Sequence, residues 1–171
     1  MKELTSLHEA AHVVLAYLSS YHFLTGDIRL TSDSTGETFV TLSKRKLLEQ
    51  GKEISAHTAS DPEIIEDAAI IFYAGLEAER IYCEQNNITL DESHSANDYN
   101  YVQQLIENSN PRFEGDRNSL IAFSREAVLA NWEPINQLAD FLQLSTNNSL
   151  SAFTAVEILD LGFGNNSFQL P

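Results

Sequence analysis

The side chains most suited to chemistry are two histidines in the segment HEAAH, residues 8–12. In an α-helix, His8 and His12 lie one turn apart on the same face, so both imidazoles can hold a single Zn²⁺ ion. Glu9 projects about 100° further round the helix, where its carboxylate can act as a general base without being a ligand. The spacing therefore predicts two metal ligands and a base, and leaves a third ligand to be found.

The residues around this motif favour a helix over residues 3–20. Leucine, alanine and valine recur at helical spacing, and residues 1–25 contain neither glycine nor proline. The alternative interpretation is an ordinary amphipathic helix, on which both histidines lie at the surface and Glu9 is a solvated charge.

Four residues further along the chain can supply the third ligand: His57, Glu79, His94 and Asp98. Glu79 lies among small and apolar residues, where it can be a surface carboxylate, a ligand, or a carboxylate that fixes a ligand histidine. Asp98 follows Ser95 by three residues, which is the spacing of a capping box. Asp98 thus has a purely structural explanation too, and the residues alone leave the third ligand open.

The pattern of the whole chain predicts a mainly α domain with a small β element, which is an α+β fold class. Residues 27–31 and 37–43 alternate between polar and apolar, and we expect a hairpin or small sheet beside the metal-binding helix. Either strand can hold an extended peptide by pairing at the sheet edge. Residues 43–60, with the basic cluster 44–46, are expected to form a solvated loop or the start of a helix.

Helices are also predicted after residue 60. Asp61 as N-cap and Pro62 at the first position begin a core helix that ends near residue 85. Gly75 inside this helix costs about 1 kcal/mol relative to alanine, which indicates that another backbone or the metal-binding helix approaches there. A helix capped by Ser95 follows to residue 107, and the segment after residue 113 is helical with a break or kink at Pro134.

The end of the chain is expected to hold one more helix. Ser149 or Ser151 can cap it, Leu161 is its expected end, and the tail, about residues 162–171, is expected to be loosely held. No internal repeat or low-complexity linker occurs, so we expect one domain over residues 1–171.

Composition restricts the function. A chain of 171 residues with 43% hydrophobic content is long enough to bury a core. Its net charge of −15 argues against binding to nucleic acid or to an anionic membrane. Cys83 is the single cysteine, so no intrachain disulfide forms, which fits a reducing compartment. No apolar run approaches 18 residues and no signal peptide begins the chain, so we expect a cytoplasmic protein without membrane insertion.

Four segments together resemble the peptidase domain of FtsH-type ATP-dependent zinc proteases, the M41 family. HEAAH is similar to that family's HEAGH, AGLEAERIY to its GGRxAEExxxG region, and SHSANDYNYVQQL to its TGAxNDLxxAT region. The segment REAVLANWEPINQLADFL is similar to its closing helices. The resemblance covers most of residues 3–160, with the segments in the same order.

The resemblance implies a zincin-like fold and assigns roles by position. It makes His8, His12 and Asp98 the ligands of Zn²⁺. It makes Glu9 the general base, and Glu79 a carboxylate that supports a ligand without binding the metal. Two histidines, one aspartate and an open position for water are typical of a catalytic zinc site. The implied activity is that of a zinc metalloendopeptidase, in which Glu9 takes a proton from water and passes it to the leaving amine.

The chain also departs from the family's pattern. It contains no GxxxxGK[ST] motif and no transmembrane segment, so we expect a peptidase without its own ATPase motor or membrane anchor. Ala11 replaces the family's glycine, and the tract after the Asp98 helix is short. Such a peptidase would act on peptides or unfolded chains, as a homo-oligomer or with a separate partner that delivers substrate. The alternative is a non-catalytic zinc-binding or assembly module of the same fold.

Overall fold

The computed structural model describes residues 2–163, apart from the side chains of residues 93 and 94. In these residues the protein is mainly helical, with small antiparallel sheets, so the predicted α+β class is confirmed. No described helix is both long enough and apolar enough to cross a membrane. The helices are α1 Lys2–Leu18, α2 Lys44–Glu49, α3 Pro62–Asn86, α4 Ala96–Glu107, α5 Arg117–Ala130, α6 Trp132–Leu144 and α7 Ala152–Phe163.

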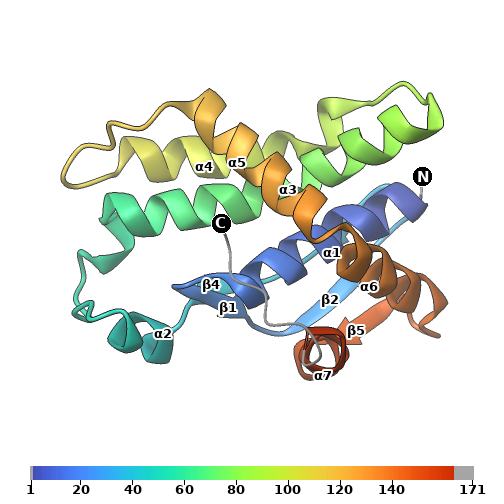
Figure 1. The fold of residues 1–171 in the computed structure, drawn as a ribbon, viewed down its shortest axis with the longest axis horizontal. Coiled ribbons are helices and arrows are strands. Elements are labelled where there is room, and N and C mark those ends of the chain that lie inside the picture. Colours follow the sequence, from blue (N-terminus) through green and yellow to red (C-terminus); the bar gives the residue numbers. More distant parts are fainter. Residues whose placement is uncertain (1, 164–171) are drawn as a thin grey trace.

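The two longest helices, α1 and α3, pack against each other and form the centre of the core. Helices α4 and α5 pack on α3, while α6 packs on α1 (Figure 1). Six alanines on the two central helices are fully buried, including Ala11 at the position where the resembled family has glycine. Close packing of α1 on α3 is what brings the HEAAH segment into contact with residues more than 60 positions away.

The strands form two small sheets along α1, on the side away from α4 (Figure 1). In one sheet β1 His22–Leu24 pairs with β4 Val40–Leu42, and in the other β2 Asp27–Leu30 lies between β3 Gly36–Glu37 and β5 Ser149–Ser151. The predicted hairpin is therefore only partly right. The segment 37–43 divides between β3 and β4, which pair with different partners, and β1 and β5 were not predicted because strands of three residues show no usable alternation.

Helix ends agree with most of the predicted caps. The side chain of Asp61 accepts a hydrogen bond from the backbone at the start of α3, with Pro62 in the first turn. Ser151 accepts one from the backbone N–H of Thr154 at 3.0 Å, so it is the cap of α7, which extends to Phe163 rather than ending at Leu161. The break before Pro134 falls between α5 and α6, and Pro134 lies in the first turn of α6. The rest of the tail, residues 164–171, is outside the described residues.

The predicted capping box at Ser95 is wrong. The Ser95 side chain makes no capping hydrogen bond, and its buried hydroxyl has no partner among the described residues. Asp98 instead contacts the histidines of α1. The structural explanation for Asp98 therefore does not apply in this fold.

The basic cluster 44–46 begins a helix, which is one of its two predicted structures, but its third residue, Lys46, is partly buried instead of solvated. Residues 44–49 form α2, and the ammonium of Lys46 reaches across to the C-terminal end of α1. Burial lowers the pKa of this ammonium. It donates at 2.7–3.2 Å to the backbone carbonyls of Ala16, Tyr17, Ser19 and His22. A single cation thus satisfies carbonyls that the end of a helix leaves without partners.

We expect Lys46→Met to lower the free energy of unfolding by about 2 kcal/mol, because partly buried carbonyls lose their donor. Lys44→Met is the matched control, since Lys44 is exposed, and it should change the stability by less than about 0.5 kcal/mol. Urea unfolding followed by circular dichroism measures both. Equal losses in the two variants would contradict a capping role for Lys46.

Candidate metal centre

The side chains of His8, His12 and Asp98 meet where α1 packs against α3 and the start of α4. One nitrogen from each imidazole and one carboxylate oxygen all lie within 4.8 Å of one another. The Oδ2 atom of Asp98 is 3.1 Å from Nε2 of His8 and 3.6 Å from Nε2 of His12. Both histidines are buried, whereas Asp98 is partly exposed. The fold therefore gathers three metal-binding side chains from two distant segments.

The other nitrogen of each imidazole is held from behind. The Nδ1 atom of His8 is 2.9 Å from Oε1 of Glu79, and Nδ1 of His12 donates to the backbone carbonyl of Ile71 at 2.8 Å. Both Nε2 atoms consequently face Asp98. Glu79 is only 4% exposed, so its interpretation as a surface carboxylate is wrong. Histidine ligands usually have their second nitrogen fixed by a carboxylate or a carbonyl in this way.

The electrostatics of the cluster favour a positive charge at its centre. Burial by itself lowers the pKa of His8, but the hydrogen bonds to Asp98 and Glu79 outweigh burial and raise this pKa to about 10. Burial by itself raises the pKa of Asp98, but its hydrogen bonds to His12 and His8 hold that pKa well below the usual range. A protonated His8 thus balances part of the negative charge of the surrounding carboxylates.

Glu9 is buried beside the two histidines and is held by the segment that contains β3. The hydroxyl of Thr38 donates to Oε2 of Glu9 at 2.6 Å. A methyl group at Gly36 would lie 2.5 Å from both Cγ and Oε1 of Glu9, so only glycine permits the strand to pass this close. Sequence reasoning missed these two contacts, because Gly36 carries no local signal beyond that of an ordinary turn residue.

A cavity of about 340 Å³ opens over these groups, which is within the size range of ligand sites. Residues 34–39 form one wall, and the other walls come from α1, from Phe72 and Glu79 on α3, and from the start of α4. The strand β3 in this wall is an edge strand, paired only with β2. Of the strands expected to hold a peptide, β3 is therefore the one that lies at the candidate site.

The other candidate ligands differ in how they relate to this cluster. His57 is exposed next to the short 3₁₀ helix Thr58–Ser60 and lines a different cavity. The side chain of His94 is outside the described residues, so its role as a ligand stays open. Glu79 binds the far nitrogen of His8 instead of lying among the three potential ligand atoms. Of the candidates with described side chains, Asp98 is the one that completes a group of three with His8 and His12.

Gly75 of α3 makes room for the His8 ring. A methyl group at this position would lie 2.5 Å from both Cε1 and Nε2 of the imidazole. The predicted close approach of the HEAAH helix, α1, to Gly75 is confirmed, and it involves the His8 side chain.

Comparisons with known proteins add nothing to this geometry. The chain matches no protein-family model and no curated protein. The resemblance to the peptidase family therefore depends on the sequence segments alone, and a function has to be argued from the arrangement of the side chains.

We expect Gly75→Ala to lower the free energy of unfolding by about 1–3 kcal/mol, because the new methyl overlaps the buried His8 ring. Gly162→Ala is the matched control, since Gly162 is also helical and a methyl there meets nothing within 4 Å. The control should be neutral or stabilising by up to about 1 kcal/mol. Chemical unfolding of the two variants measures the difference, and a neutral Gly75→Ala would contradict the tight packing on His8.

Proposed function

We propose that the protein is a zinc-dependent metallopeptidase of zincin-like fold, in which His8, His12 and Asp98 hold the Zn²⁺ ion. The observation that carries the proposal is the convergence of their three donor atoms within 4.8 Å, with Glu9 lining the same cavity. Two imidazole nitrogens and one carboxylate oxygen form a donor set that suits zinc and leaves a fourth position for water or substrate. The hydrogen bonds that fix both Nδ1 atoms also support the proposal, because they leave both Nε2 atoms for the metal.

The chain's own residues supply positioning and proton transfer. When bound, Zn²⁺ lowers the pKa of a water molecule and polarises the carbonyl of the peptide bond. Glu9 would take a proton from water and pass it to the leaving amine. Thr38 holds Oε2 of Glu9, so we expect Oε1 to be the atom that receives the proton. Glu79 and the carbonyl of Ile71 keep the two imidazoles from turning during the reaction.

The substrate in this proposal is an extended peptide or an unfolded protein segment. The edge strand β3 lies in the wall of the cavity and can pair with such a segment through backbone hydrogen bonds. A folded protein does not present its backbone in this way. A homo-oligomer, or a separate partner that delivers unfolded chains, is therefore part of the proposal.

A non-catalytic zinc-binding module of the same fold is the second candidate. The observation in its favour is the environment of Glu9, which is 5% exposed, bonded to Thr38 and packed against Gly36. A carboxylate in these contacts can serve to attach the segment 34–39 to α1 rather than to move protons. The two candidates share the metal and differ only in turnover.

Zinc should bind with a stoichiometry of about one per chain, and Asp98→Ala should weaken binding by on the order of 100-fold or more. Glu107→Ala, on the exposed end of the same helix, is the control and should bind zinc normally. With the pKa of His8 raised to about 10 in the metal-free protein, its proton must leave when zinc binds at pH 7. The dissociation constant should therefore fall about tenfold per pH unit between pH 6 and 8.

Isothermal titration calorimetry in buffers of different ionisation enthalpy measures the affinity and the number of protons released. No zinc binding by the wild-type protein would refute both candidate functions. If Asp98→Ala bound zinc with full affinity, the protein would have a metal site in which Asp98 is not a ligand.

Glu9→Gln should retain zinc and lose peptidase turnover by a factor of about 10²–10⁴, because the amide cannot accept the proton. Cleavage of unfolded casein and of a quenched fluorescent peptide library, with zinc content measured on the same samples, provides the test. Turnover that survives in Glu9→Gln would contradict the proposed mechanism. A zinc-loaded wild-type protein without turnover would instead favour the non-catalytic module.

A further inference from the structure

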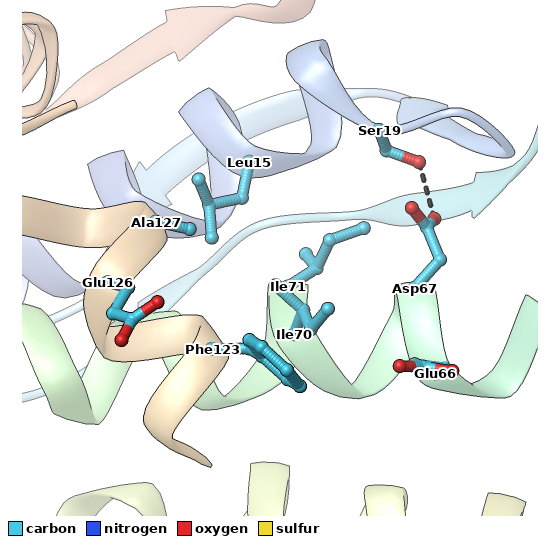
Figure 2. A pocket seen from close by; sticks show the side chains of 9 residues that line it. All are labelled: Leu15, Ser19, Glu66, Asp67, Ile70, Ile71, Phe123, Glu126 and Ala127. Carbon is cyan, nitrogen blue, oxygen red and sulfur yellow. Dashed lines mark hydrogen bonds between the residues drawn. The ribbon is translucent and has the colours of Figure 1, made fainter. Parts of the chain in front are cut away.

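A second cavity, of about 250 Å³, lies between α1, α3 and α5 and shares no lining residue with the cavity over the metal centre (Figure 2). Its floor is apolar and consists of Leu15 from α1, Ile70 and Ile71 from α3, and Ala127 from α5. Phe123 of α5 stands beside Ile70 (Figure 2). The volume is below the 300–1,000 Å³ that is usual for small-molecule sites. It suits a single long side chain better than a whole cofactor or metabolite.

Three carboxylates flank this apolar floor, with Glu66 and Asp67 at one end and Glu126 at the other (Figure 2). Oδ2 of Asp67 accepts hydrogen bonds from Ser19 at 2.5 Å and from His22 at 2.6 Å, so this side chain is fixed in position. Glu66 and Glu126 are exposed, and neither makes an ion pair within the described part of the chain. No described lysine or arginine lines the cavity. An apolar floor between anionic ends is complementary to an aliphatic chain that carries a cation.

The surface beside the cavity indicates what kind of molecule brings that cation. Phe123 and Leu129 of α5 are 53% and 48% exposed, and Ala122 and Ala130 are exposed on the same face. Ala122 and Leu129 are seven residues apart, as are Phe123 and Ala130, so the four lie on one side of α5, with the charged Glu126 among them. Large apolar side chains exposed together on one side of a helix are typical of a protein interaction surface. A free small amine would leave these side chains uncovered.

We propose that this cavity docks a basic, apolar segment of a partner protein. The aliphatic part of a lysine or arginine side chain lies on Ile70 and Ile71, and its cation meets Glu66 or Glu126. Lysine and arginine combine a long apolar stem with a terminal charge, which is the shape and charge that this site requires. Anchor side chains in such pockets carry much of the affinity of an interface. The net charge of −15 attracts basic partners from a distance.

The probe for this proposal is the peptide acetyl-Gly-Leu-Lys-Ala-Leu-Gly-amide, compared with the same peptide carrying norleucine in place of lysine and with free n-hexylamine. We expect the lysine peptide to bind about tenfold more tightly than either of the others, since it alone combines the cation with apolar neighbours. Methyl NMR spectra of the full-length protein should show the shifts at Ile70, Ile71 and Ala127, with or without zinc present.

The double variant Glu66→Gln, Glu126→Gln should reduce the affinity for the lysine peptide to that for the norleucine peptide. Glu114→Gln, Glu157→Gln is the control, because it changes the net charge equally at exposed positions outside the cavity and should bind as the wild type does. Equal affinity for the lysine and norleucine peptides would show that the site recognises only apolar groups, and it would overturn the proposal. Binding of n-hexylamine as tight as that of the peptide, or no shift at the cavity methyls, would overturn it as well.

Discussion

The buried contact of His8 with carboxylates from two other helices is the constraint on which the packing of α1, α3 and α4 depends. An unpaired charge costs several kcal/mol when it is removed from water, whereas a paired and hydrogen-bonded one costs much less. The His8 ring is paired on one side with Glu79 and on the other with Asp98. These two contacts restrict the placement of α1 against α3 and α4, and Gly75 must lack a side chain to permit the observed one.

The same cluster explains why a divalent cation is the proposed ligand. Glu9, Glu79 and Asp98 bring three carboxylates close to two imidazoles. The hydrogen bonds to Asp98 and Glu79 outweigh burial and raise the pKa of His8 to about 10, so the site favours a positive charge. A proton on His8 and a metal ion between the imidazoles are alternative ways to supply that charge. The proton fixes the side chains in nearly the arrangement that the metal would need, so little reorganisation would accompany metal binding.

Local signals were sufficient to predict the helices and the motif, but not the pairing of distant segments. The spacing of HEAAH and the cap at Asp61 depend on neighbours within one helical turn, and both predicted their helices correctly. The pairing of β2 with β5 joins segments more than 100 residues apart, which no periodicity encodes. Ser95 has the sequence of a cap, yet Asp98 contacts two histidines instead, because tertiary contacts outweighed a local preference. Lys46 likewise caps a helix far from its own.

Helix α3 serves both the metal centre and the second cavity, and Ile71 is where they come closest. Its carbonyl accepts the hydrogen bond from His12, while its side chain lies in the floor of the cavity. A docked segment can change the metal centre only if the backbone at Ile71 has two conformations and the segment binds one of them more tightly. The Ile71 side chain is 1% exposed and its peptide unit lies inside a 25-residue helix. We therefore expect the backbone at Ile71 to have a single conformation. In turn, we expect the shared helix to keep the two sites at a fixed distance, so that zinc at one and a docked segment at the other would bind independently.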